Sequence, residues 1–173
     1  MITALVGAQW GDEGKGKVID IMAEKADVVV RATGGNNAGH TVVSGGKTYK
    51  LHLVPSGILY DGTLCCIGPG CVVDPLALLK EMDEVKANGT SLDGLRIDYR
   101  AHIVMPYHLL IDELSEEAKD EGGIGTTKKG IGPCYMDKAE RIGIRFYDIL
   151  HPEVFAEKLR ANLNAKNKYI GGM

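Results

Sequence analysis

The stretch Gln9-Trp10-Gly11-Asp12-Glu13-Gly14-Lys15-Gly16-Lys17 decides the fold, because it joins an apolar run at 2–8 to a helical pattern at 16–25. A glycine-rich turn between a strand and a helix leaves backbone N–H groups free. The positive end of the helix dipole reinforces them, so such turns bind anions, usually phosphate. The lysines of the stretch add positive charge, but its two carboxylates do not suit passive phosphate binding. They indicate a metal ion, a proton to be removed, or both. A turn whose glycines serve geometry alone is the alternative, and this density of charge argues against it.

The same stretch matches the phosphate-binding pattern G-x-x-x-x-G-K-[ST] from Gly11 to Lys17 and departs from it at Val18. The missing hydroxyl is the group that holds Mg²⁺ in an ordinary P-loop NTPase, so the departure argues against a GTPase switch of that class. Another side chain must hold any metal, and Asp12 is the nearest candidate.

The bulk properties of the chain exclude several classes of protein. Its 173 residues suffice for one domain with a real core, and a net charge of −3 argues against a general nucleic-acid-binding protein. The sequence contains neither an apolar run of membrane-spanning length nor a signal-peptide pattern. We therefore expect no nucleic-acid or membrane partner and a cytoplasmic location.

Four cysteines occur, and three of them, Cys65, Cys66 and Cys71, surround an Ile-Gly-Pro-Gly segment that is typical of a turn. Their spacing lacks the paired ligand sets of a metal site. We expect buried, reduced thiols here and at Cys134.

The order of the predicted elements indicates an α/β fold. A strand at 2–8, a helix at 16–25 and a strand at 27–32 form a βαβ unit, which requires parallel strands and a right-handed crossover. Further expected elements are a hairpin (41–44 and 47–53) around Gly45-Gly46, strands at 64–68, 95–97 and 102–105, and helices at 75–88, 107–119, 135–141 and 152–166. Two helices carry apolar stripes, predicted as Leu76, Leu79, Met82 and Val85, and as Leu109, Leu110, Leu114 and Ala118. The fold class is α/β, with a largely parallel sheet flanked by helices, a P-loop-like nucleotide-binding architecture and a β-hairpin insertion, in one domain over residues 1–173.

A second glycine-rich loop, GGNNAGHT at 34–41, follows the strand predicted at 27–32. Loops at the carboxyl ends of neighbouring parallel strands share a crevice, so this loop and the first one should face each other. It offers two amides, a glycine carbonyl for a metal, and the imidazole of His40, which suits proton donation or stabilisation of a phosphoryl group. A lone histidine is more often structural, but its place beside a phosphate site favours a catalytic role.

A third loop, IGTTKKGIGP at 124–133, combines two hydroxyls, two cations and three glycines, which again suits phosphate binding. A flexible surface loop is the alternative. Loops this long inside a compact domain are usually functional or disordered. Downstream, Arg141 is able to make a bidentate phosphate contact, although an exposed arginine is the commoner outcome.

Taken in order, QWGDEGKGK, GGNNAGHT and IGTTKKGIGP followed by Arg141 resemble the adenylosuccinate synthetase family, and the similarity extends over essentially the whole chain, including LHLVPSGIL at 51–59. That family uses GTP to couple IMP to L-aspartate, which forms adenylosuccinate in purine (AMP) biosynthesis. The resemblance implies a ligase with GTP, IMP and L-aspartate as substrates, Mg²⁺ as cofactor, and a homodimer.

The resemblance also assigns roles to matching positions. Asp12 resembles the general base that removes the N1 proton of IMP, and also a Mg²⁺ ligand together with the Gly39 carbonyl. His40 resembles the general acid that supports transfer of the γ-phosphoryl group of GTP to the 6-oxygen of IMP, with Lys15 neutralising charge. Arg141 resembles the arginine that reaches the IMP phosphate in the other subunit of a homodimer. The implied GTP contacts are Gly11, Asp12, Glu13, Gly14, Lys15, Gly16, Lys17, Gly39, His40 and Thr41. The implied IMP contacts are Asp12, Glu13, Gly14, Lys15, Asn37, Ala38, Gly39, His40, Thr127 and Arg141.

The family enzyme is much longer than this chain, and its later part supplies guanine recognition, the aspartate-binding loop and further IMP contacts. We therefore expect residues 1–173 to be the N-terminal part of a single GTP- and IMP-binding domain, and to be inactive alone. A non-catalytic nucleotide-binding or dimerisation module of the same fold is the alternative. The presence of both Asp12 and His40 argues against it, because a binding module has no need of both.

Overall fold

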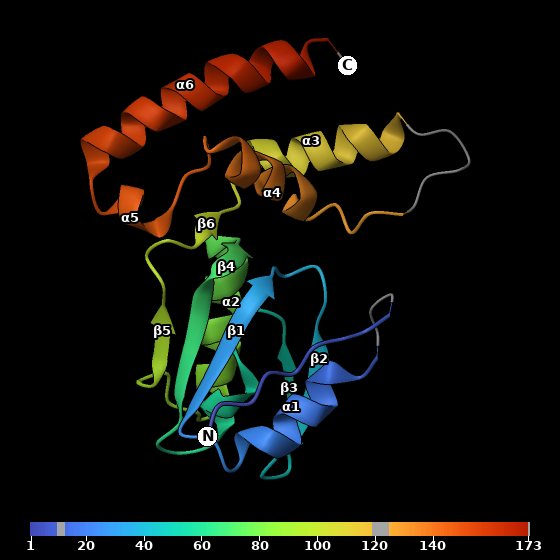
Figure 1. Ribbon diagram of the computed structural model, residues 1–173, viewed down its shortest axis with the longest axis vertical. Coiled ribbons are helices and arrows are strands. Elements are labelled where there is room, and N and C mark those ends of the chain that lie inside the picture. Colours follow the sequence, from blue (N-terminus) through green and yellow to red (C-terminus); the bar gives the residue numbers. More distant parts are fainter. Residues whose placement is uncertain (10–12, 119–124, 173) are drawn as a thin grey trace.

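A computed structural model describes residues 1–9, 13–118 and 125–172. Figure 1 shows the sheet and its flanking elements in one half of the molecule, helices α3 to α6 in the other, and the two termini at opposite ends. None of the helices in the described ranges is both long enough and apolar enough to cross a membrane.

The main sheet is parallel throughout. Its longest strand, β4 (Leu64–Val73), pairs with β1 (Val28–Gly34), with β5 (Leu95–Ile97) near its start and with β6 (His102–Ile103) near its end. Strands β4 and β5 are parallel, and helix α2 connects them, so the three elements form a βαβ unit. Parallel neighbours need such a crossover connection. The predicted α/β class with a largely parallel sheet is therefore confirmed.

Helix α2 (Pro75–Ala87) begins and ends almost where the sequence predicts. The Asp74 carboxylate accepts the backbone N–H groups of Leu76 and Ala77 at 3.0 and 3.2 Å, which caps the helix before a proline. The predicted apolar stripe is wrong at Leu76 and Leu79, which are 78% and 55% exposed, and right at Met82 and Val85. A series built only from i+3 steps drifts around the helix by about 60° per step. The face that packs on the core instead comprises Leu78, Glu81, Met82 and Val85.

The hairpin insertion is confirmed. Strands β2 (His40–Ser44) and β3 (Lys47–Leu51) are antiparallel, with His40 opposite Leu51, and both residues of the Gly45-Gly46 turn have positive φ. A single 3₁₀ turn, η1 (Ser56–Leu59), then leads into β4. Val42, Tyr49 and Leu51 bury the inner face of the hairpin in the main core.

The strand predicted at 2–8 is wrong. Residues 1–9 form no strand and are exposed, so the helix that follows, α1 (Lys15–Ala23), is not preceded by a sheet strand in the described part of the chain. An apolar run becomes a strand only where neighbouring strands accept its backbone hydrogen bonds. Among the described residues, β1 is the edge strand of the sheet and β4 is its one partner.

The turn predicted at Gly68-Pro69-Gly70 is also wrong, because β4 runs straight through it. The pairing with β1 shifts register between Arg31 and Thr33, and a Cβ at Gly70 would overlap the Ala32 carbonyl oxygen. The glycines thus allow two backbones to approach at a bulge. The cysteines are free thiols, as predicted, and Cys65, Cys71 and Cys134 are buried while Cys66 is half-buried.

Four helices form the other half of the molecule: α3 (Pro106–Glu117), α4 (Ile131–Glu140), α5 (Phe146–Ile149) and α6 (Pro152–Ile170). Helix α4 begins four residues earlier than predicted, and α5 was not predicted. The inward face of α3 holds Tyr107, His108, Ile111 and Asp112 rather than the predicted stripe, and Leu110 is 43% exposed. A polar network of His108, Asp137 and Lys166 joins α3, α4 and α6.

Candidate active site

The first loop is described from Glu13 onward, and Trp10, Gly11 and Asp12 lie outside the described residues. Gly14 occupies the N-cap of α1 in the left-handed region (φ 77°), a conformation that favours glycine. No side chain of the described residues caps this helix, so its first N–H groups are available to an anion. Glu13 accepts the Gln9 backbone N–H at 3.2 Å and forms an ion pair with Lys15.

His40, the first residue of β2, lies directly against the start of α1. A Cβ added at Gly16 would lie 2.8 Å from His40 Cγ, so His40 can approach the helix backbone this closely because residue 16 is a glycine. Asp20, one turn further along the same helix, places its Oδ1 3.2 Å from His40 Nε2. The structure therefore brings the first two loops together, with the imidazole beside the available N–H groups of α1.

The second loop projects four of its predicted ligands outward: Asn37, Ala38, Gly39 and Thr41 are exposed. The neighbouring Asn36 is buried at 7% exposure, and its Oδ1 has no hydrogen-bond partner in the described part of the chain. It lines a cavity of about 190 Å³ with His52, Lys80, Glu84 and Lys129, among others. The second loop, the third loop and α2 thus meet around one polar cavity.

Two charged residues that sequence reasoning missed anchor the backbone around this cavity, Arg31 at the second loop and Glu81 at residues 52–54. Arg31 donates to the Gly35 carbonyl at 2.8 Å and to the His52 carbonyl. From α2, the Glu81 carboxylate accepts the backbone N–H groups of three consecutive residues, at 2.8 Å from His52, 2.9 Å from Leu53 and 3.1 Å from Val54. The one signal in the sequence is the position of Glu81, which falls between Leu78 and Val85 on the core-facing stripe.

The third loop is described from Gly125 onward, so Ile124 lies outside. Thr127 is exposed, and two acidic residues of α3 anchor the loop ends, because Glu116 accepts the Gly125 N–H at 2.8 Å and Asp112 accepts the Gly130 N–H at 2.9 Å. The loop leads directly into α4, whose first residue packs against the second loop. Thr127 therefore lies on a short, anchored segment beside the second loop.

Arg141 lies at the opposite end of α4. It is the C-cap of this helix, has a left-handed backbone (φ 65°) and is exposed. A ten-residue helix is about 15 Å long, so within one chain this guanidinium and Thr127 are held at opposite ends of a rigid element. The geometry does not bring Arg141 to the loop cluster of its own chain.

The predicted magnesium ligands are only half described. Gly39 stands in the exposed second loop next to His40, whereas Asp12 lies outside the described residues. In the ranges that the structure covers, no three His, Cys, Asp or Glu side chains gather as a metal site. A carboxylate and a backbone carbonyl are oxygen ligands of the type that Mg²⁺ accepts alongside water and phosphate oxygens, so the predicted pair fits this ion chemically.

Comparison with known proteins decides what this loop cluster belongs to. Residues 4–173 match the family model described as adenylosuccinate synthetase. The chain belongs to the adenylosuccinate synthetase family. Adenylosuccinate synthetase from Thermoanaerobacter sp. (strain X514) is 62% identical over 164 residues, which cover 95% of this chain and 38% of the relative. The enzyme from Staphylococcus epidermidis (strain ATCC 35984) is 59% identical over 169 residues, which cover 98% of this chain and 40% of the relative.

Solved structures of synthetases agree with this assignment. A fully ligated adenylosuccinate synthetase from Plasmodium falciparum superposes with a TM-score of 0.83 at 42% identity, over 94% of this chain and 38% of that one. A cyanophage S-2L succinoaminodeoxyadenylate synthetase, bound to dGMP and to dATP as an energy donor, is more distant, with a TM-score of 0.59 and 28% identity over 77% of this chain. The chain spans about two fifths of the length of the relatives it matches.

Proposed function

We propose that the polypeptide containing this chain is a GTP-dependent adenylosuccinate synthetase, a ligase that forms a C–N bond between IMP and L-aspartate. The observation that carries the proposal is the placement of His40 against Gly16 at the start of α1, in a chain of this family. An imidazole beside available helix N–H groups supports transfer of a phosphoryl group, because donors and charge converge where negative charge develops.

The reaction divides into two steps with defined roles for residues of this chain. Asp12 removes the N1 proton of IMP, which makes the 6-oxygen anionic and nucleophilic. That oxygen attacks the γ-phosphorus of GTP and releases GDP, while His40, Lys15 and the N–H groups of α1 stabilise the charge in transfer. The amino group of L-aspartate then attacks C6 and expels phosphate, which yields adenylosuccinate.

The remaining contacts follow from the same proposal. Thr127 of the third loop binds the 5′-phosphate of IMP, and Asn37 and Ala38 contact the same nucleotide. Bound Mg²⁺ would be held by Asp12 and the Gly39 carbonyl, and it supplies charge neutralisation for the phosphates.

Substituting Asp12 by Asn tests the catalytic proposal against the non-catalytic module. The measurement is adenylosuccinate formation by the full-length polypeptide from IMP, GTP and L-aspartate, followed chromatographically. We expect turnover to fall at least about a hundredfold, the usual scale for a lost general base, with IMP binding retained. A wild-type protein that binds IMP and GTP but makes no product would support the binding module instead.

Two further parts of the proposal concern assembly. Residues 1–173 alone are expected to make no adenylosuccinate, and product from that purified chain contradicts this. For the homodimer, mixing Asp12→Asn and Arg141→Leu subunits should restore up to about a quarter of wild-type activity, because one site of each mixed dimer has both groups intact. No recovery after subunit exchange would place Arg141 outside the partner's site.

A further inference from the structure

Tyr135 of α4 lies at the point where the second loop leaves the sheet. Its hydroxyl accepts the Gly34 backbone N–H at 2.8 Å and donates to the Gly70 carbonyl at 2.8 Å. The Thr33 hydroxyl lies 3.2 Å from the Tyr135 hydroxyl, within hydrogen-bond distance. One hydroxyl therefore joins the ends of β1 and β4 just beyond the register shift in their pairing.

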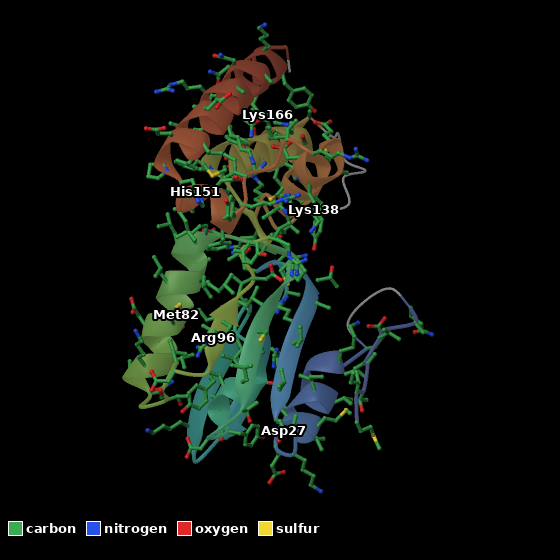
Figure 2. All side chains as sticks on the ribbon, turned by 60° about the vertical axis from the view of Figure 1, so that its left-hand side comes forward. Asp27, Met82, Arg96, Lys138, His151 and Lys166 are labelled. Atoms are coloured by element: carbon green, nitrogen blue, oxygen red, sulfur yellow. The ribbon has the colours of Figure 1, made fainter. Side chains whose placement is uncertain are left out.

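The same face of α4 makes two more contacts with the sheet ends. Ile131, one turn before Tyr135, occupies the space where a side chain at Gly35 would lie. Lys138, about one turn after it, donates to the Pro69 carbonyl at 2.6 Å. Positions 131, 135 and 138 follow the i, i+4, i+7 spacing of one helix face, and Figure 2 shows Lys138 where the helical half meets the sheet.

Of the two loops that this face joins, the third is assigned to the phosphate of IMP, whereas the second is assigned to GTP as well as IMP. The segment 34–41 starts at Gly34, whereas the segment 125–130 ends at the N-cap of α4. Because Tyr135 is bonded to Gly34 and α4 begins directly after Gly130, a shift of α4 would displace both loops together.

We propose that Tyr135 is a positioning residue that couples the phosphate-binding loop at 125–130 to the loop that carries Gly39 and His40. The inference rests on the proposed function for the identity of the two ligands, but not for the mechanical connection. Binding of a nucleotide monophosphate on one loop then preorders the other loop for the nucleoside triphosphate, and the reverse holds by linkage.

The test compares Tyr135→Phe with Tyr107→Phe in the full-length polypeptide. Tyr107 is a matched control, because its buried hydroxyl also receives a hydrogen bond, from Asn162 at 3.2 Å, but joins α3 to α6. The first readout is amide hydrogen exchange without ligand. Tyr135→Phe should speed exchange in 33–39 and in 125–130 together, whereas Tyr107→Phe should leave both segments unchanged.

The second readout is the binding linkage, measured as the IMP dissociation constant with and without saturating GDP and Mg²⁺. We expect Tyr135→Phe to reduce the linkage factor about three- to tenfold, the scale of known coupling substitutions, and Tyr107→Phe to change it less than about twofold. An unchanged linkage factor, or an equal loss in both variants, overturns the proposal.

The two readouts separate failure of this inference from failure of the proposed function. If the wild-type protein binds neither nucleotide, the function fails, and exchange in the two segments still decides the positioning role. Faster exchange in only one of the two segments, or in neither, overturns that role whatever the ligands are.

Discussion

Replacing Asp137 by Asn is expected to destabilise the protein strongly, although the two side chains have nearly the same volume. The carboxylate is fully buried between α3, α4 and α6, where it accepts a hydrogen bond from His108 Nε2 at 3.0 Å and pairs with Lys166. His108 carries its proton on Nε2, because its Nδ1 accepts the Met105 N–H at 2.9 Å. Burial alone would raise the pKa of Asp137, but the hydrogen bonds from His108 and Lys166 outweigh it and hold that pKa below its usual value.

An asparagine amide offers one acceptor oxygen where the carboxylate offers two. Whichever way the amide is turned, its NH₂ group faces either the His108 Nε2–H or the Lys166 ammonium, so a donor meets a donor. Removing one partner of a buried charged pair costs about 3–5 kcal/mol. The Lys166 side chain retains 14% exposure and can turn toward water, which sets the expected loss near 3 kcal/mol. Figure 2 shows this lysine on α6 above the other helices.

Urea unfolding of the full-length polypeptide, followed by circular dichroism, measures the change. The control is Lys128→Gln. The Lys128 side chain is 47% exposed and its Nζ lies 3.9 Å from Glu113 Oε1, so losing this charge should change the free energy of unfolding by less than about 0.5 kcal/mol. A loss below about 1 kcal/mol for Asp137→Asn at an unchanged m-value would refute the donor–donor argument.

Three further predictions concern buried groups. Glu81→Gln should lower the free energy of unfolding by about 1–3 kcal/mol, because the new NH₂ group faces the Leu53 N–H from which Glu81 Oε2 now accepts a hydrogen bond. A free energy of urea unfolding within about 0.5 kcal/mol of the wild-type value would contradict this. Burial, with neighbouring cations, lowers the pKa of His102 from 6.5 to about 4, so the unfolded chain takes up a proton in that range and the folded chain does not. The free energy of unfolding should therefore fall as pH drops from 6.5 to about 4, and His102→Gln should flatten that slope. Burial also raises the pKa of Cys134 to about 12, which leaves little of its reactive thiolate at neutral pH. Under native conditions, iodoacetamide should therefore modify the half-buried Cys66 before Cys134. Equal rates of modification at the two thiols would show that Cys134 is not buried as described.

Local signals in the sequence predicted local structure well. The Asp74-Pro75 start of α2 and the Gly45-Gly46 turn of the hairpin each depend on the chemistry of a few adjacent residues. The sequence also predicted that the first two loops face each other, and His40 does lie against the start of α1. The strand at 2–8 on which that prediction depended is absent from the described residues, and the meeting of the third loop with the second was not predicted. The roles assigned to Asp12, Thr127 and Arg141 remain predictions.

The segment at 2–8 shows where such signals end. Its apolar composition is that of a buried strand, yet Ile2 and Val6 are 100% and 80% exposed. On β1, Val28 and Val30 are exposed on the sheet face opposite buried Val29. Composition gives a segment a tendency to form a β-strand. Whether the strand forms also depends on a neighbouring strand that accepts its hydrogen bonds and on side chains that cover its apolar face, and both lie elsewhere in the chain.

The residues that hold the loops were harder to find than the residues proposed to act, for a physical reason. Glycine-rich loops with charge are visible in sequence because each loop carries its own signal. Glu81, Tyr135 and Asp137 act on backbone or side-chain groups 27 to 102 positions away, so their burial and their partners are set by packing alone. An acidic residue within the core-facing stripe of a helix is the one signal of such a role in the sequence. Burying its carboxylate without a partner would cost about 3–5 kcal/mol, so a partner is expected. Glu81 gives this signal, because it lies between Leu78 and Val85 on the buried face of α2. Its carboxylate is therefore buried when the helix packs on the core, and it accepts hydrogen bonds from backbone N–H groups.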